Sequence, residues 1–363
     1  MSTERRLIDH HCHGVARDPL ARAEFESFLT ESDRPPPPGC TAFDSLLGIA
    51  VRDVCGPVLE LPAGVDADDY LARRAELGGD EANRRLLAGA GLEALLVDTG
   101  LADDALLGLD ELARLSAATA REVVRLESVA EEVAAGGVGA AEFEAVFAER
   151  LRRWAAAAVG VKSIIAYRHG LDFDPRRPSS AEVMSAADRW LAGGGGRLDD
   201  EVLLRHVLWE GLATGLPLQL HTGFGDPDLN LARSDPALLT EFLRACADTG
   251  SPVLLLHCYP YHRHAAYLAN VFPHVYLDVG LTIPHVGRRA AAVLAEVLEL
   301  APFHKLLYSS DAYGLAELYL VAATLFREAL AEVLDELRIT GPDRERIATM
   351  IGSDNARRVY ALG

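Results

Sequence analysis

The sequence predicts an α/β fold in which eight short parallel strands alternate with helices and close into a (β/α)8 barrel, also called a TIM barrel. Short apolar runs, typical of strands buried on both faces, alternate with segments rich in Ala, Leu, Arg and Glu. Polar side chains stand at the ends of these runs, where such barrels carry their active sites. The length of 363 residues fits a single barrel domain over residues 1–363.

The first predicted strand leads into a cluster of histidines. The apolar residues 7–8 precede the segment DHHCHG at residues 9–14. Because residues i and i+2 of a strand point to the same face, we expect His11 and His13 to project together. Two imidazoles at the end of a rigid strand are suitable metal ligands. His10 points the opposite way and is expected to pack or to support the ligands.

A polar and helical section, about residues 17–90, follows this strand. It contains four consecutive prolines at 35–38, which exclude helix and indicate a surface loop. Amphipathic stretches follow at 41–56 and 66–90. No strand pattern occurs within the section, so we expect a helical insertion after strand one rather than a separate domain.

The seven remaining strands alternate with helices along the rest of the chain. The strands are predicted at 92–98, 123–129, 161–167, 216–221, 253–257, 275–279 and 306–310. The helices are predicted at 103–121, 130–158, 181–192, 199–214, 235–249, 285–300 and 313–336. An open doubly wound sheet is the alternative arrangement. The count of strands favours the barrel, and the GxGxxG turn of a dinucleotide-binding sheet does not follow the first strand.

Composition and charge limit the partners. A net charge of −19 repels nucleic acid and anionic membranes, so we expect neither as a partner. No run approaches the roughly 20 apolar residues of a membrane helix, and no signal-peptide core precedes the histidines. Five cysteines without a CxxC motif predict a cytoplasmic protein without a disulfide framework. A small molecule is the expected partner, and assembly into a homo-oligomer stays open.

Polar residues stand at most of the predicted strand ends, which meet at one face of a barrel. In strand order they are His11 and His13, Asp98 and Thr99, Arg125 and Glu127, Tyr167 with Arg168 and His169, His221, His257, Asp278, and Asp311. A single histidine at a strand end is more often structural, but the joint pattern over strands one, five, six and eight predicts a metal site. The other histidines are expected to be surface or structural residues: His262, His264, His274, His285 and His304.

Four motifs resemble those of the amidohydrolase superfamily of metal-dependent barrel hydrolases: IDHHCHG (8–14), LQLHTG (218–223), LLLHCYP (254–260) and YSSDAYG (308–314). The end of the chain, GSDNARRVY (352–360), resembles the closing helix of the second large branch, amidohydrolase 2. Three further segments are similar to the amidohydrolase-like domain that some proteins carry fused to a glutamine synthetase: VRLESVAEEV (124–133), VGVKSIIAYRHGL (159–171) and HTGFGDPDLNL (221–231).

This resemblance implies one divalent metal, zinc in most members, held by His11, His13, His221 and Asp311. It also implies hydrolysis of a small amide that bears a carboxylate, such as a γ-glutamyl amide, by attack of a metal-bound hydroxide. Asp311 would accept the proton of the attacking water, and His257 would polarise the substrate carbonyl or hold the oxyanion. Two alternatives stay open, a metal-dependent decarboxylase of the same branch and a non-catalytic metal-binding scaffold.

Three further residues have less certain roles. Some superfamily members carry a carboxylated lysine on strand four, but Lys162 is near the start of its predicted strand, about 16 Å too deep. A buried lysine paired with an acid is therefore the favoured interpretation. Glu127 could bridge a second metal, as a strand-three glutamate does in the related dipeptidases. Arg168 is placed to bind a substrate carboxylate through a bidentate fork. One metal or two stays open.

Overall fold

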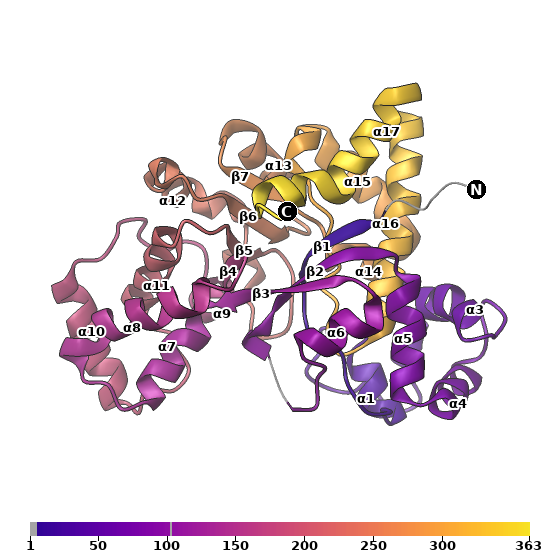
Figure 1. Cartoon of the computed structure of the whole chain (residues 1–363), viewed down its shortest axis with the longest axis horizontal. Helices are drawn as coiled ribbons and strands as arrows, with labels where there is room; N and C mark the ends of the chain where they lie inside the picture. Colours follow the sequence, from indigo (N-terminus) through magenta and orange to yellow (C-terminus); the bar gives the residue numbers. More distant parts are fainter. Residues whose placement is uncertain (1–5, 102–103) are drawn as a thin grey trace.

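The computed structural model describes residues 6–101 and 104–363 and has an α/β fold around a curled parallel sheet of seven strands. The strands are β1 (Leu7–Cys12), β2 (Leu92–Asp98), β3 (Thr119–Arg125), β4 (Gly160–Ser163), β5 (Leu218–Thr222), β6 (Val253–His257) and β7 (Val275–Leu277). Each strand pairs with the next one along the chain, from β1 to β7. This order is consistent with a TIM-like barrel (Figure 1).

The eighth predicted strand, residues 306–310, is an extended segment and not a regular strand. It nevertheless contacts both edges of the sheet. The backbone N–H of Leu307 donates to the carbonyl of Leu277 on β7 at 3.0 Å, and the N–H of Asp311 donates to the carbonyl of His11 on β1 at 3.0 Å. These hydrogen bonds hold Asp311 beside the histidines of β1.

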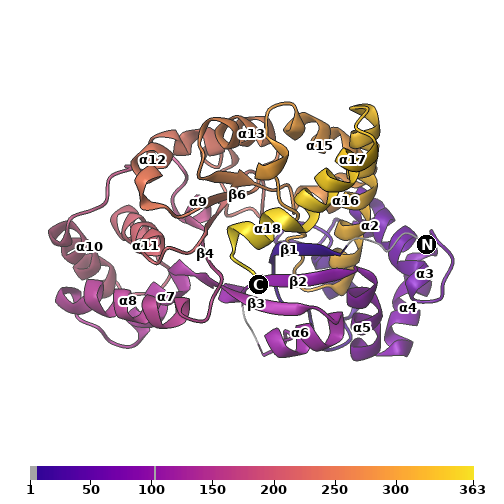
Figure 2. The same cartoon turned by 45° about the horizontal axis from the view of Figure 1, so that its top comes forward.

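Helices surround the sheet (Figure 1). Their bounds are α1 (Arg22–Ser27), α2 (Leu46–Ala50), α3 (Gly56–Val58), α4 (Ala67–Leu77), α5 (Gly79–Gly89), α6 (Leu109–Ser116), α7 (Leu126–Ala135), α8 (Ala140–Ala155), α9 (Ile165–Arg168), α10 (Ser180–Ala192), α11 (Glu201–Ala213), α12 (Thr240–Ala245), α13 (His262–Val271), α14 (Thr282–Val286), α15 (Ala290–Leu298), α16 (Ala316–Glu336), α17 (Gly341–Thr349) and α18 (Asn355–Val359). Helices α1 to α5 all lie between β1 and β2 in the chain, and Figures 1 and 2 show α3 to α5 on the side of the molecule that carries α16.

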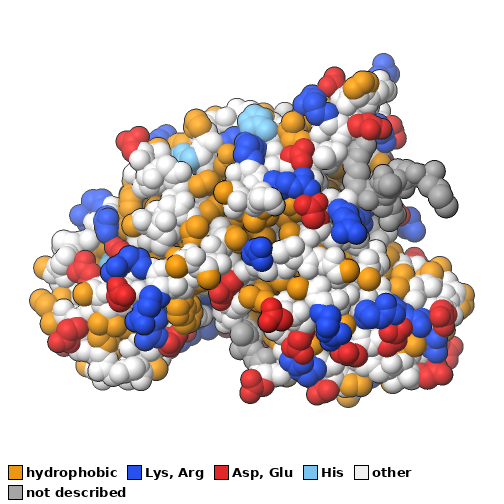
Figure 3. All heavy atoms as spheres, in the orientation of Figure 1, with side chains coloured by type: hydrophobic (Ala, Val, Ile, Leu, Met, Phe, Trp, Pro, Cys, Tyr) orange, Lys and Arg blue, Asp and Glu red, His pale blue; other side chains and the backbone are white. Residues whose placement is uncertain are grey.

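Acidic and basic side chains share the surface that Figure 3 shows, and they alternate over it. None of the helices that the structure describes is long and apolar enough to cross a bilayer. Residues 1–5, which begin the chain before the histidine segment, and residue 103 of one predicted helix lie outside the described residues.

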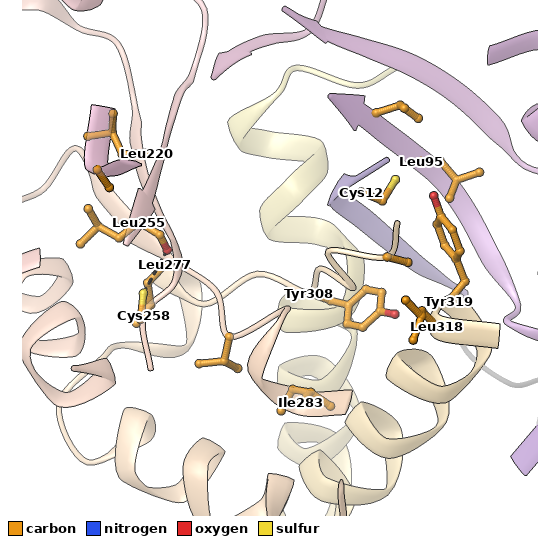
Figure 4. Packing of buried hydrophobic residues seen from close by; sticks show 14 of the residues in the cluster. Cys12, Leu95, Leu220, Leu255, Cys258, Leu277, Ile283, Tyr308, Leu318 and Tyr319 are labelled. Atoms are coloured by element: carbon orange, nitrogen blue, oxygen red, sulfur yellow. Dashed lines mark hydrogen bonds between the residues drawn. The ribbon is translucent and has the colours of Figure 1, made fainter. Parts of the chain in front are cut away.

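Alternate residues of the strands pack on opposite sides of the sheet, as the period of a strand requires. Leu95 and Leu255 belong to the large core between sheet and helices, part of which Figure 4 shows. Their neighbours Leu96 and Leu254 belong to a second apolar cluster on the inner side. Tyr360 joins that inner cluster from the residue after α18, the helix that Figure 2 shows next to β1.

Strands β3, β4 and β7 end earlier than the sequence predicts, and a carboxylate on α7 explains the end of β4. The strand expected at 123–129 runs from Thr119 to Arg125, so Glu127 lies in α7. The strand expected at 161–167 ends at Ser163, and α9 follows it. The Glu127 carboxylate accepts hydrogen bonds from Ser163 Oγ at 2.5 Å and from the backbone N–H of Ile164 at 3.0 Å. These bonds take Ile164 out of the β ladder.

Candidate metal centre

Three histidines that can bind a metal converge on Asp311. His11 is the second-last residue of β1 and His13 directly follows the strand, and their ring centroids lie 5.0 Å apart. Asp311 Oδ1 lies 3.0 Å from His11 Nε2 and 3.4 Å from His13 Nε2. His257, the last residue of β6, places its Nε2 3.6 Å from Asp311 Oδ2. The backbones of His257 and Asp311 have positive φ angles, +66° and +52°, a strained conformation that is concentrated at functional sites.

Neighbouring acceptors decide which ring nitrogens of the first two histidines face Asp311. His11 Nδ1 lies 2.8 Å from Gln219 Oε1, and His13 Nδ1 lies 3.2 Å from the backbone oxygen of Asp98. The Gln219 amide nitrogen donates to Tyr360 Oη at 2.7 Å, so its oxygen is the atom that faces His11. Both histidines therefore carry their proton on Nδ1. Their Nε2 lone pairs point at Asp311, the arrangement that metal-binding histidines use.

His221 completes the histidine group from β5. Its ring centroid lies 4.6 Å from that of His257, and only 4% of the residue is exposed. His221 Nε2 is buried and has no hydrogen-bond partner among the described residues. His257 Nδ1 and Asp311 Oδ1 are likewise buried and unpartnered within residues 6–101 and 104–363. Such orphaned acceptors cost free energy unless a ligand satisfies them.

These residues fit a divalent cation. The ligand atoms of His11, His257 and Asp311 lie within 4.8 Å of one another, and so do those of His11, His13 and Asp98. Imidazole nitrogens and carboxylate oxygens are the donors that such cations accept in proteins.

The electrostatics of the site keep His11, His221 and His257 neutral and Asp311 ionised. Burial, assisted by the charge of Lys162, lowers the pKa of His11 to about 3. Burial also lowers the pKa values of His221 and His257. For Asp311, burial alone would raise the pKa, but the polar groups around it hold the pKa of the carboxyl well below its usual range. Neutral imidazoles and an ionised carboxylate are the forms that bind a metal.

Lys162 reaches the site, contrary to the depth expected from the sequence. The expected distance of about 16 Å assumed a strand through residue 167. Because β4 ends at Ser163, Lys162 lies at its C-terminal end, opposite Gln219 on β5. Its buried Nζ lies 3.2 Å from His11 Nε2, so it contacts a histidine rather than the acid that we expected. Burial lowers the pKa of Lys162.

The structure separates the other two residues of less certain role. Glu127 is fully buried and bonds the end of β4, and it does not line the cavity above the histidines. Arg168 does line that cavity, where its Nη1 lies 3.2 Å from a carboxylate oxygen of Glu131. Its Nε has no hydrogen-bond partner among the residues described.

A cavity of about 640 Å³ opens over the histidines. Besides His13, His221, His257, Asp311, Lys162 and Arg168, its lining includes Glu31, Asp226, Arg197 and His285. Sequence reasoning missed the last four. His285 was expected to be a surface or structural residue, but it faces the cavity from α14. Gln219, which supports His11, could have been found from the sequence. It precedes His221 by two residues on the same strand and so points to the same face.

A parallel sheet whose strand ends bring a His-x-His pair, two more histidines and an aspartate together beside one cavity is the arrangement of a metal-dependent hydrolase. The family model described as amidohydrolase matches residues 8–362, so the chain belongs to the amidohydrolase family. This confirms the resemblance seen in the sequence. An enzyme of this family acts on a small-molecule substrate.

Two solved structures and one protein of known sequence are similar to this chain. A crystal structure assigned as a metal-dependent hydrolase of Lactobacillus casei superposes with a TM-score of 0.89 at 30% identity, covering 99% of this chain and 96% of that one. A uronate isomerase of Bacillus halodurans shares the fold, with a TM-score of 0.67 at 14% identity, over 99% of this chain and 94% of that one. Protein fluG of Emericella nidulans is 28% identical over 98% of this chain. The chain spans about half, 46%, of the length of fluG.

Proposed function

We propose that this enzyme hydrolyses a small amide that bears a carboxylate, with a γ-glutamyl amide as the favoured substrate class. The observation that carries the proposal is the convergence of neutral imidazoles and ionised Asp311 in one cavity, with their acceptor atoms unpartnered. Arg168 lines the same cavity and keeps an unpartnered Nε, which supports the proposal that the substrate bears a carboxylate. The similarity to fluG supports the assignment to this family, but it does not support the choice of substrate.

One zinc ion is the proposed cofactor, and the residues that would hold it are His11, His13, His221 and Asp311. Such an ion supplies a Lewis acid that polarises a carbonyl and acidifies water. Asp311 would accept the proton of the attacking water, since its carboxylate is ionised and faces the cavity. His257 would hydrogen-bond the developing oxyanion from the neighbouring strand end. Arg168 would orient the substrate through its carboxylate.

We also propose that the whole chain, residues 1–363, forms a single closed (β/α)8 barrel with a helical insertion at about 17–90. Hydrogen bonds from Leu307 and Asp311 to the two edges of the sheet support closure. A cytoplasmic location is part of this proposal. The five cysteines, all free, support it because disulfides are rare in that compartment.

Elemental analysis of protein purified without chelator tests the metal site. We expect about one zinc per chain, lost in His13→Ala and retained in His304→Ala, whose exposed side chain lies outside the cavity. Two metals per chain would move the proposal to a dinuclear site that includes Lys162. Absence of metal, even after zinc is supplied, would contradict the proposal and leave a scaffold role.

Product analysis tests the reaction class. Zinc-loaded enzyme is incubated with a panel of γ-glutamyl amides, and released amine and carbon dioxide are both measured. Amine release that is abolished in Asp311→Asn supports amide hydrolysis. Carbon dioxide release without amine would instead establish the decarboxylase alternative, because both reactions use the same ligand set.

A further inference from the structure

One wall of the cavity carries an acid without a cationic partner. Glu31 comes from the segment after α1, and His285 comes from α14, and both line the cavity. Glu31 Oε1 lies 3.8 Å from His285 Nε2, too far for a hydrogen bond. No lysine or arginine among the described residues pairs with Glu31.

His285 presents a second acceptor to the same point. Its Nδ1 lies 3.0 Å from the backbone oxygen of Leu281, so Nδ1 carries the proton and Nε2 carries a lone pair. Burial lowers the pKa of His285, which keeps the ring neutral at pH 7. His285 Nε2 is buried and has no hydrogen-bond partner in the part of the chain that the structure describes. When Glu31 is ionised, it and His285 are therefore two acceptors that face each other 3.8 Å apart.

Asp226 adds a third acceptor to the lining of the cavity, with an exposed side chain. It lies in the loop after β5 and lines the same cavity. One of its oxygens accepts the backbone N–H of Asp228 at 2.9 Å. Burial, together with the charges of Asp311 and Asp226, raises the pKa of Glu31 to about 7. Burial and these two acids thus both disfavour the ionised form of Glu31 in the absence of a cation.

The arginines of the cavity do not compensate this charge, because each has an acid of its own. Arg125 Nη2 lies 2.6 Å from Asp98, and Arg197 Nη1 lies 2.9 Å from Asp228. Arg168 contacts Glu131. Each of the three arginines therefore faces an acid other than Glu31, which leaves ionised Glu31 as an acceptor for a cationic group of a ligand.

We propose that Glu31, His285 and Asp226 form a subsite for a protonated primary amine of the substrate. An ammonium group offers three N–H donors, which match these three acceptors. Together with a carboxylate at Arg168, this subsite defines a zwitterionic substrate, an amide of an amino acid whose amino group is free. The inference rests on the proposed function and adds the recognition of the amine to it.

Two probes that differ by one amine test the subsite. Zinc-loaded enzyme is titrated by calorimetry with L-glutamate and with glutarate, which lacks the amino group. We expect wild type to bind L-glutamate at least about tenfold more tightly, because a charge-assisted contact in a partly buried site contributes at least that much. In Glu31→Gln we expect the ratio of the affinities for L-glutamate and glutarate to fall towards one. Glu24→Gln changes an exposed acid of α1 and is expected to keep the wild-type ratio.

His285→Phe provides a second variant that keeps a ring in place but removes the acceptor, and we expect it to lower the preference as well. Thermal unfolding and zinc content show that each variant is folded and loaded. Equal affinity of wild type for the two probes, binding of neither, or a preference that persists in Glu31→Gln would overturn the subsite. Failure of the function is distinguishable: a glutamate preference without hydrolysis of any amide would remove the reaction and leave the amine subsite standing.

Discussion

Gln219 controls which nitrogen His11 presents to the site, although it makes no contact with the cavity itself. Its amide oxygen faces His11 Nδ1, and its amide nitrogen is held by Tyr360 Oη and by the backbone oxygen of His10. His10 in turn lies 2.8 Å from Asp278. This buried network fixes the orientation of Gln219, and through it the tautomer of His11.

Gln219→Leu is expected to weaken zinc binding about 10- to 100-fold, because His11 loses the acceptor that orients its ring. Zinc affinity is measured by competition with a chromophoric chelator. Gln219→Glu keeps an acceptor at the same place and is expected to stay closer to wild type. Unchanged affinity in the leucine variant would show that the network does not position His11.

Glu31 predicts a pH dependence of stability. Its pKa is about 7 in the folded state and near 4.5 when unfolded, so between these values the folded protein holds a proton that the unfolded chain has released. Stability therefore falls as pH rises from 4.5 to 7 and this contribution is constant above. Because the side chain is 31% exposed, we expect a change of roughly 1–2 kcal/mol.

Urea unfolding of chelator-treated wild type and Glu31→Gln, at pH values from 5 to 8, measures this change. The variant has no group to titrate here, so the difference between the two proteins should shift in its favour as pH rises. Parallel pH profiles for the two proteins would contradict the raised pKa.

At the scale of elements, the sequence predicted the strand order well but not where β3 and β4 end. The apolar run continues past Ser163 through Ile165, so periodicity gives no reason to stop the strand. The stop comes from Glu127, which lies on another element and accepts the hydrogen bonds that a longer strand would make. Such a tertiary contact has no signal in local sequence, and Lys162 was misplaced for the same reason.

A buried ion pair links the segment between β1 and β2 to α16. Arg74 Nε on α4 lies 2.7 Å from Glu317 Oε1, and Tyr70 donates to the same carboxylate at 3.0 Å. We expect Glu317→Gln to lower the free energy of unfolding by about 3–5 kcal/mol, because it leaves Arg74 as an uncompensated buried charge.

Urea unfolding measures this loss, with Glu336→Gln at the exposed end of the same helix as the control. The double variant Arg74→Met with Glu317→Leu removes both charges and is expected to recover much of the stability. A single variant no less stable than the control would show that the ion pair does not fasten the two parts.

At the scale of the whole molecule, segments far apart in the chain meet at the candidate metal centre. The His-x-His pair was recognisable because period-2 geometry is local, and the strand-end histidines because parallel strands share one edge. Glu31 and His285 were not recognisable, because nothing in the local sequence of a loop or a helix shows which side chain will face a cavity formed by distant segments. The eighth strand was recognised by its apolar run, although its backbone pairs at only a few positions.

This convergence predicts that zinc stabilises the entire fold. The proposed ligands come from β1, β5 and the segment after residue 310, so the unfolded chain cannot present them together. Binding to the folded state alone adds about 2.7 kcal/mol when free zinc is a hundred times its Kd. We expect that gain in urea unfolding of wild type and His304→Ala, and its loss in Asp311→Asn. An equal gain in Asp311→Asn would mean that the ion binds elsewhere, since removal of the charged ligand cannot leave a site on these strand ends intact.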